Sequence, residues 1–212
     1  MSQPVHYAVH DRVAVITIDN PPVNALGPGV LEGIAAGVAR AGIDPEVVAS
    51  VVIGSGATFI AGADINVFRT LTTPEQSLAR SEGSHALLRR IEDAHKPVVA
   101  AIHGHALGGG LETAMACHYR VALSSARVGQ PEVQLGIIPG AGGTQRLPRL
   151  CGAALALEMC TNGRPLSASH ARRAGILDFV VDADLLDAAV AFALARAASD
   201  GPRPTRYRDE AL

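Results

Sequence analysis

Short apolar runs separated by turn residues recur along this chain. Four of them are rich in Val and Ile, and each is followed closely by Gly, Asn or Ser: Val13–Ile18, Val47–Ile53, Val98–Ile102 and Arg120–Leu123. Unbroken apolar runs of this length are typical of strands that are buried on both faces. The pattern therefore predicts an α/β domain rather than a sheet with one face in water.

Segments with helical spacing lie between these runs. In Gly29–Ala41 the apolar residues recur every three or four positions, as on one face of a helix. A second helix is predicted to start after Thr73 and to continue toward Ile91, because Thr73 can cap it, Pro74 suits its first position and Gln76 completes a capping box. Further predicted helices are Leu111–His118, Gly143–Leu150, Ala153–Cys160, Leu166–Ala174 and Asp184–Ala198, and a further strand is Leu177–Val181.

The size and composition fit one globular domain followed by a short tail. The chain has 212 residues, of which 48% are apolar and 18% charged. A chain of this length buries roughly 70% of its unfolded surface. We assign residues 1–200 to the domain. The segment Gly201–Leu212 is polar and contains proline, so we expect a linker or a frayed end there.

Charge and aromatic content argue against two classes of partner. The formal net charge is −2, aromatic residues make up 3% of the chain, and tryptophan is absent. A nucleic-acid binder normally has a basic surface and aromatic side chains for stacking, and a membrane-surface protein normally has a polybasic patch. We therefore expect neither nucleic-acid nor membrane binding.

The cysteines and the N-terminus indicate a compartment. Cys117, Cys151 and Cys160 fit neither a disulfide framework nor a metal-ligand spacing, so we expect free, buried thiols in a reducing environment. The N-terminus lacks the apolar core of a signal peptide, and no apolar run reaches the ~18 residues of a membrane span. These features together predict a cytoplasmic protein.

Two glutamates stand alone in otherwise uncharged stretches. Glu112 is the only charged residue between Pro97 and Tyr119, and Glu132 is the only one between Val128 and Gln145. A lone carboxylate in apolar surroundings is unfavourable unless it faces a wet cleft or a protonated state is useful. A solvent-facing glutamate at a helix end is the alternative for Glu112. Because both isolated glutamates lie in glycine-rich stretches, we favour a functional site.

Glycine-rich loops could supply the second half of such a site. Gly108, Gly109 and Gly110 precede a predicted helix, where free N–H groups and the helix dipole favour an anion. The loop from Phe59 to Asp64 offers more small residues. Two such loops could donate hydrogen bonds to one developing oxyanion. Glycines also serve tight packing, so these loops alone are weak evidence.

Several common motifs are missing from the sequence. It contains no G-x-G-x-x-G, no Walker A lysine after a glycine loop and no G-x-S-x-G, which argues against dinucleotide, nucleoside-triphosphate and serine-hydrolase sites. His103 and His105 form an H-x-H pair, with His118 further on, but no carboxylate or thiol completes a metal site at a sensible spacing. We therefore expect no metal, and we expect these histidines to be packed or at the rim of a site.

Four spaced motifs resemble one known family. They are NPPVNAL, FIAGADI, IHGHALGGGLETAMACHYRVA and ARVGQPEVQLGIIPGAGGTQRLPRLCG. In this combination they are similar to the core of the enoyl-CoA hydratase/isomerase (crotonase) superfamily, and the resemblance runs from about Val5 to Ala198. HYRVA and NPPVNA are most similar to the N-terminal hydratase/isomerase half of multifunctional fatty-acid β-oxidation enzymes.

The resemblance implies a fold and a set of site residues. The fold would be a crotonase-like spiral of repeated ββα units, and the substrate a coenzyme A thioester. The N–H groups of Ala63 and Gly109 would form the oxyanion hole, and Glu112 and Glu132 would be the catalytic carboxylates. The substrate-binding residues would be Ala61, Gly62, Ala63, Asp64, Ile65, Gly108, Gly109, Pro131 and Gly140. No separate cofactor is implied, because coenzyme A enters as part of the substrate.

The presence of both glutamates favours hydration within the superfamily. We expect an enoyl-CoA hydratase that adds water across the trans-2 double bond. Isomerisation of a 3-enoyl to a 2-enoyl thioester is one alternative, and a non-catalytic acyl-CoA-binding module of a truncated multifunctional enzyme is another. The resemblance implies either a homotrimer or hexamer, or the N-terminal part of a multifunctional chain.

Overall fold

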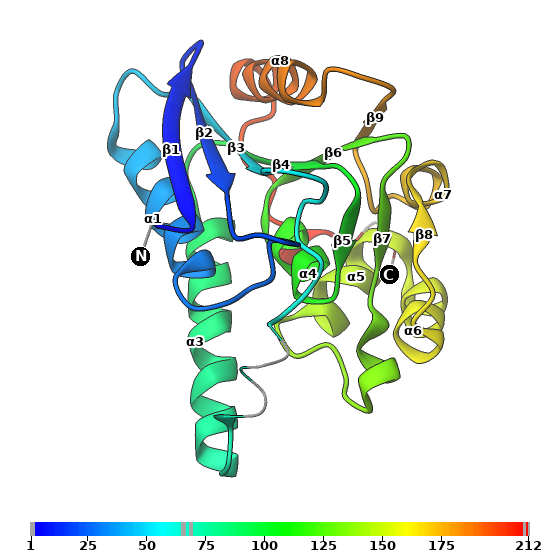
Figure 1. The fold of residues 1–212 in the computed structure, drawn as a ribbon. Helices are drawn as coiled ribbons and strands as arrows, with labels where there is room; N and C mark the ends of the chain where they lie inside the picture. Colours follow the sequence, from blue (N-terminus) through cyan, green and yellow to red (C-terminus); the bar gives the residue numbers. More distant parts are fainter. Residues whose placement is uncertain (1–2, 65–66, 68–69, 210, 212) are drawn as a thin grey trace.

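The runs predicted to be buried strands form the centre of a six-stranded sheet (Figure 1). In the computed structural model, which describes residues 3–64, 67, 70–209 and 211, the strand order is β1-β2-β3-β4-β6-β9. Only the hairpin of β1 and β2 is antiparallel, and the other neighbours pair in parallel. The strands are β1 (Val5–His10), β2 (Val13–Ile18), β3 (Ala49–Gly54), β4 (Val98–Ile102), β6 (Tyr119–Leu123) and β9 (Phe179–Val181).

Helices cover both faces of this sheet, which explains why its strands are apolar throughout. On one face α8 (Leu185–Ala198) packs on alternate strand residues such as Val13 and Val51. Figure 1 shows α8 lying across the top of the sheet. The intervening residues, such as Val52, belong to a larger core with the helices of the other face: α1 (Val30–Ile43), α3 (Pro74–Glu92) and α4 (Gly109–Ala116). The prediction of an α/β fold is confirmed.

A second, three-stranded sheet positions the two lone glutamates. Its strands are β5 (His105–Leu107), β7 (Arg127–Gly129) and β8 (Leu166–Ser167). Because β5 and β7 pair in parallel, with Leu107 opposite Gly129, their C-terminal ends lie side by side. The helix α4 follows β5, and the 3₁₀-helix η1 (Pro131–Leu135) follows β7. The chain thus repeats a strand–strand–helix unit, and each of these two units delivers one glutamate to the same place.

The remaining helices lie beside this second sheet. They are α5 (Gly143–Cys151), α6 (Ala153–Asn162), α7 (Ala168–Arg173) and η2 (Thr205–Tyr207). The helix α3 starts as predicted: the Thr73 side chain accepts a hydrogen bond from Gln76 N, and the Gln76 side chain completes the capping box. None of the described helices is both long enough and apolar enough to span a membrane.

Several predicted boundaries are wrong. The strands β1, β5 and β7 were not predicted, and Leu166–Ser167 was predicted to be helical, although these residues pair with β7 before α7 begins. The strand predicted from Val47 begins at Ala49, and the helix predicted from Leu111 begins at Gly109. The strands β5 and β7 were missed because three residues are too few to show a periodicity. The strand β1 has six residues, but they are mostly exposed and include two histidines, so they form no apolar run.

The segment predicted to be a linker or a frayed end is packed where the structure describes it. Thr205 is fully buried, and its Oγ1 donates a hydrogen bond to the carbonyl of Met115 at 2.8 Å. The backbone N–H of Arg206 donates to Glu92 Oε1 at 2.9 Å. The polar residues of this segment therefore satisfy buried groups of distant elements, which local composition cannot indicate.

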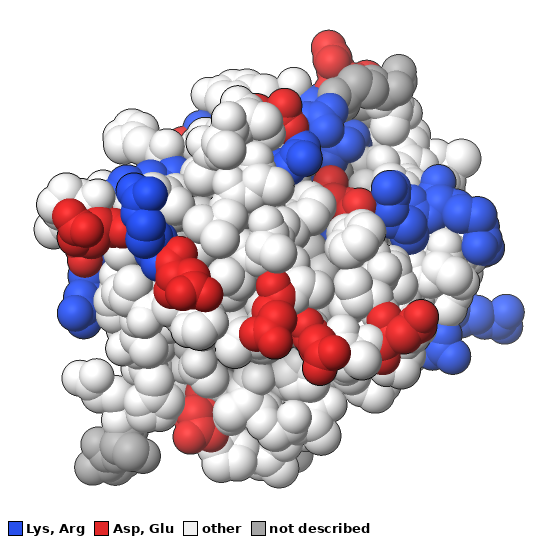
Figure 2. All heavy atoms as spheres, turned by 90° about the horizontal axis from the view of Figure 1, so that it is seen from above, with Lys and Arg blue, Asp and Glu red and all other residues white. Residues whose placement is uncertain are grey.

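The surface above α8 carries charges of both signs. In this view acidic and basic side chains are interspersed, with broad uncharged areas between them (Figure 2). This face therefore has no field of a single sign.

Candidate active site

A pocket of about 960 Å³ lies where the two strand–strand–helix units meet α1, α3 and the loop before Asp64. Both lone glutamates line it, together with glycine backbone and apolar side chains. This size suits a small-molecule ligand. The predicted site residues that line it are Ala61, Gly62, Ala63, Gly108, Gly109, Glu112, Pro131, Glu132 and Gly140.

Two residues of the predicted set are not in this group. Asp64 is not among the described residues that line the pocket. Its carboxylate lies beside Gly27, where a Cβ atom added to this glycine would be 3.7 Å from Asp64 Oδ2. Ile65 lies outside the described residues.

Glu112 is held by main-chain amides rather than by a side-chain cation. It stands in the first turn of α4, is 3% exposed, and its Oε1 accepts hydrogen bonds from Ala141 N and Gly143 N, both at 2.7 Å. Burial raises the pKa of Glu112, and the two amide donors and the charge of Arg146 act in the opposite direction. The alternative of a solvent-facing glutamate is therefore wrong. The amides favour the ionised form of this buried acid.

Glu132 has a different environment. It lies in η1, is 8% exposed, and burial raises its pKa from 4.5 to about 7. Its own backbone N–H lowers the pKa, and the charge of Glu112 raises it further. This carboxyl group therefore holds a proton near neutral pH.

Gln130 is a site residue that the sequence analysis missed. With its amide oriented so that the nitrogen faces Glu132, Gln130 donates to both carboxylate oxygens, at 3.0 and 2.8 Å. A Cβ atom added at Gly143 would lie 2.6 Å from the other end of the Gln130 side-chain amide and 3.0 Å from Glu112 Oε1. The groups around the two acids therefore converge at Gly143. The available signal was the position of Gln130, two residues before Glu132 in the same uncharged stretch.

The two glycine loops also meet at this place. The distances from a Cβ atom added to each glycine show how closely the groups approach. Such an atom at Gly109 would lie 3.8 Å from Ala63 N, and one at Gly108 would lie 3.1 Å from Glu132 Oε1. Gly109 is the first residue of α4, so its N–H has no acceptor one turn earlier in the helix. Gly108 has φ +52° and ψ −124°, a conformation that glycine readily adopts. The Gly108 backbone thus approaches the carboxyl group of Glu132, and the loop with Ala63 lies beside Gly109.

Arg146 also escaped the sequence analysis. It is buried on α5 and pairs with the buried Glu92 at the end of α3, at 2.8 Å. The residues around Arg146 in the sequence do not indicate this ion pair, because Glu92 is 54 residues away.

The predictions for His118 and Cys117 are confirmed. His118 is fully buried, its Nδ1 accepts from Val98 N, its Nε2 bonds to Glu92 O, and burial lowers its pKa to about 4. Cys117 is a buried free thiol, and burial raises its pKa to about 12. Cys151 and Cys160 are free but only partly buried, which corrects the expectation, because they lie on the outer helices α5 and α6. Among the described residues, no group of three or more His, Cys, Asp and Glu could hold a metal ion.

Comparisons with known proteins agree with this arrangement. The family model of enoyl-CoA hydratase/isomerase matches residues 9–208. A probable enoyl-CoA hydratase of Bacillus subtilis (strain 168) is 45% identical over 191 residues, which are 89% of this chain and 74% of that protein. The peroxisomal bifunctional enzyme of Danio rerio is 49% identical over 186 residues, which are 88% of this chain but 25% of that enzyme. The crystal structure of an enoyl-CoA hydratase from Bacillus anthracis superposes with a TM-score of 0.85 at 35% identity, covering 94% of this chain and 78% of the other.

Proposed function

Because the chain belongs to the enoyl-CoA hydratase/isomerase family, we propose that it is an enoyl-CoA hydratase of fatty-acid β-oxidation. The reaction adds water across the trans-2 double bond of an enoyl-CoA thioester. The observation that carries the proposal is the pair of buried carboxyl groups in one pocket, Glu112 with two amide donors and Glu132 with a pKa of about 7. The names of the relatives favour hydration over isomerisation alone or a non-catalytic binding module.

The glycine loops polarise the substrate in this proposal. The thioester carbonyl oxygen accepts hydrogen bonds from the N–H groups of Ala63 and Gly109, which the proximity of these two residues supports. Electron density then moves from the C2–C3 double bond toward the carbonyl, and C3 becomes electrophilic. A pair of fixed main-chain donors is effective because it needs no reorganisation as charge develops on the oxygen.

The two glutamates move the protons. Ionised Glu112 takes a proton from a water molecule while the water oxygen forms a bond to C3. The electron pair of the double bond forms a new C–H bond at C2 with the proton of Glu132. One water molecule has then been added, Glu112 is protonated and Glu132 is ionised. Transfer of one proton from Glu112 to Glu132 restores the starting enzyme.

The different surroundings of the two acids support this division of roles. Burial raises the pKa of Glu112 as well, but two amide hydrogen bonds and the charge of Arg146 act against burial and favour the ionised form that a general base requires. The raised pKa of Glu132 keeps a proton available near neutral pH, as a general acid requires. Because the acids interact, the pair titrates as a unit rather than as two independent groups.

The direct test is hydration of crotonyl-CoA, followed as loss of the absorbance of the conjugated thioester. We expect turnover by the unmodified protein and a loss of roughly 10²–10⁴ in kcat for Glu112→Gln and for Glu132→Gln. Glu46→Gln is the matched control, because this glutamate is exposed in the turn before β3. An undiminished kcat in both variants would refute the assignment of Glu112 and Glu132 as the catalytic acids. Binding of acyl-CoA in calorimetry, without turnover in the absorbance assay, would favour a non-catalytic binding module.

Assembly is a further part of the proposal. The chain spans 74% of the Bacillus subtilis relative and about a quarter of the bifunctional enzymes, so we extend only the hydratase activity to it. The family resemblance supports a homotrimer or a hexamer, which sedimentation equilibrium can test.

A further inference from the structure

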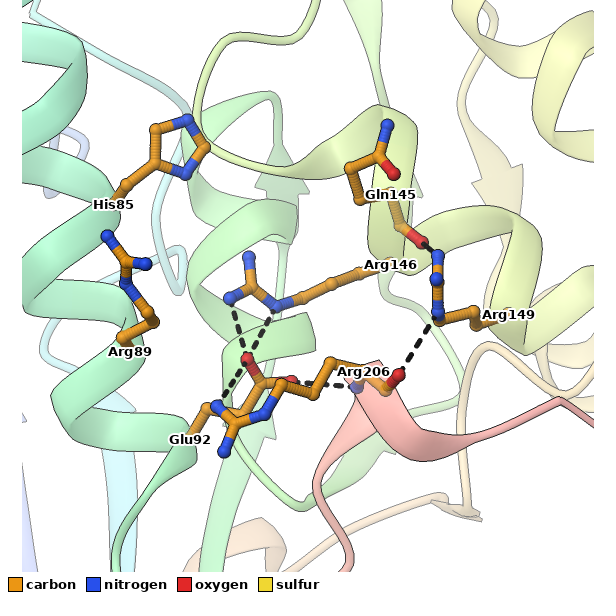
Figure 3. Close-up of a pocket in the computed structure, with 7 residues that line it drawn as sticks. All are labelled: His85, Arg89, Glu92, Gln145, Arg146, Arg149 and Arg206. Atoms are coloured by element: carbon orange, nitrogen blue, oxygen red, sulfur yellow. Dashed lines mark hydrogen bonds and ion pairs between the residues drawn. The ribbon is translucent and has the colours of Figure 1, made fainter.

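A second cavity, of about 240 Å³, lies between α3, α5 and η2. It is open to solvent and is lined mainly by arginines, around one buried carboxylate, Glu92. Figure 3 shows Arg146 extending from α5 across this space to Glu92 at the end of α3. Nothing in the hydration mechanism above uses these residues.

Arg146 and Glu92 hold each other firmly. Arg146 is 7% exposed and Glu92 is 1% exposed. The guanidinium donates to Glu92 Oε2 from Nη2 at 2.8 Å and from Nε at 3.3 Å. From the other side Arg206 contributes its backbone N–H, at 2.9 Å to Glu92 Oε1, and its Nη1, at 3.5 Å to Oε2. Glu92 therefore fixes the position of the Arg146 guanidinium, and Arg206 in turn fixes the carboxylate of Glu92.

The third nitrogen of Arg146 reaches the loop that binds Glu112. Its Nη1 donates to the carbonyl oxygen of Ala141 at 3.2 Å, and the N–H of the same residue donates to Glu112 at 2.7 Å. Between these contacts, Gly142 has φ +98°, and a Cβ atom there would lie 2.3 Å from Arg146 Nη1. The loop is thus shaped to let the guanidinium approach. A continuous path of contacts runs from Glu92 through Arg146 and Ala141 to the carboxylate of Glu112.

We propose that Arg146, held by Glu92, is a positioning residue for hydration. It fixes the loop 141–143, so that the two N–H donors hold the Glu112 carboxylate at one orientation toward the attacking water. Arg146 acts through Ala141 and does not touch the substrate. This inference rests on the proposed hydratase function, and it adds a residue to the machinery of the same site.

The charge of Arg146 gives the proposal a second measurable consequence. It lowers the pKa of Glu112, against the effect of burial. Among the described residues, titratable groups near this acid or its loop include Glu132 on η1, Cys160 on α6 and His85 on α3. The Cε1 atom of His85 lies 3.9 Å from where a Cβ atom added at Gly142 would be. Glu32 on α1 and Arg80 on α3 line the same pocket as Glu112. The positive charge of Arg146 favours the ionised form of Glu112. Removing that charge should raise the pH at which the base becomes active.

The test compares Arg146→Ala and Arg146→Lys with Arg149→Ala in the crotonyl-CoA assay. Arg149 lines the same cavity one helical turn later, but its guanidinium donates to the carbonyls of Gln145 and Arg206 instead. We expect kcat of Arg146→Ala to fall by about 10²-fold with KM changed by less than about threefold, because a misplaced base slows chemistry without weakening binding. The acid limb of its pH–rate profile should move to higher pH.

Arg146→Lys separates the charge from the contacts. Lysine keeps the positive charge but cannot bond to Glu92 and Ala141 in the same forked geometry. We expect a lowered kcat with the acid limb left in place. Arg149→Ala should keep the wild-type kcat and pH profile.

Chemical rescue provides a readout that a general loss of stability would not give. Because the cavity is open to solvent, guanidinium ions should enter the space vacated in Arg146→Ala and raise its kcat at least about tenfold, whereas sodium chloride of equal ionic strength should not. Circular dichroism checks the fold of each variant. If Arg146→Ala does not fold, the kcat and pH profile of Arg146→Lys decide.

Two results would overturn the inference. One is a folded Arg146→Lys or Arg146→Ala with wild-type kcat, and the other is a loss of kcat in Arg149→Ala equal to that in Arg146→Ala. Failure of the proposed function is distinguishable, because the unmodified protein would then hydrate nothing.

Discussion

Replacing Glu132 with glutamine should stabilise the folded protein in neutral and alkaline solution. Burial raises the pKa of this carboxyl group from 4.5 to about 7, so the folded state resists its ionisation. At ~1.36 kcal/mol per pH unit, the difference corresponds to an upper limit of about 3 kcal/mol. Glutamine is neutral at every pH and avoids this unfavourable contribution.

The direction of the pH dependence follows from the raised pKa. Below about pH 4.5 the group is protonated in both the folded and the unfolded state, and its ionisation has no effect on stability. Between about pH 4.5 and 7 the unfolded chain releases the proton and the folded chain keeps it. The free energy of unfolding of the wild type should therefore fall through this range, relative to that of Glu132→Gln, and stay lower above it.

Urea unfolding followed by far-ultraviolet circular dichroism measures this difference. The wild type and Glu132→Gln are compared at about pH 5 and about pH 8, with Glu46→Gln as the control for an exposed glutamate. We expect the stability advantage of Glu132→Gln to grow by about 2–3 kcal/mol between the two pH values. An advantage that does not change with pH would refute the reasoning about the environment of Glu132.

Three further outcomes follow from the structure. The kcat/KM of the wild type should fall about tenfold per pH unit well above pH 7, as Glu132 loses its proton, and a profile flat to about pH 9 would contradict its role as an acid. Gly108→Ala should lower the free energy of unfolding, measured with urea, by about 1–3 kcal/mol and should also lower kcat. The reason is that Gly108 has φ +52° and that the added Cβ atom would lie 3.1 Å from Glu132 Oε1. A wild-type free energy of unfolding together with a wild-type kcat would contradict this. Asp178→Ala should destabilise the protein by about 3–5 kcal/mol, because it removes the ion-pair partner of the fully buried Arg120, and an unchanged thermal midpoint would disprove it.

The parts of the fold that the sequence predicted are those with strong local signals. The strands Val13–Ile18 and Val98–Ile102 were predicted with the boundaries observed, because continuous apolar runs between turn residues leave little alternative. The start of α3 was predicted from Thr73 to Gln76, since a capping box is a pattern of neighbouring residues.

The site was predicted in part for a similar reason. An isolated glutamate in an uncharged, glycine-rich stretch can be recognised without knowing the fold, and both Glu112 and Glu132 line the pocket. The pairing of Glu92 with Arg146 could not be recognised, because neither has its partner nearby in the sequence and only the packing of α3 and α5 brings them together. The pairing of Thr205 with Met115, 90 residues apart, was hidden in the same way.

The dependence of Glu112 on backbone donors has a consequence for how such a centre can be studied. Its two partners are the peptide nitrogens of Ala141 and Gly143, and neither residue has a side-chain functional group that could be deleted. An alanine scan would pass over Ala141 without changing anything. Replacing single amides by esters, through chemical ligation or nonsense suppression, would remove one donor at a time and so weigh each peptide group separately.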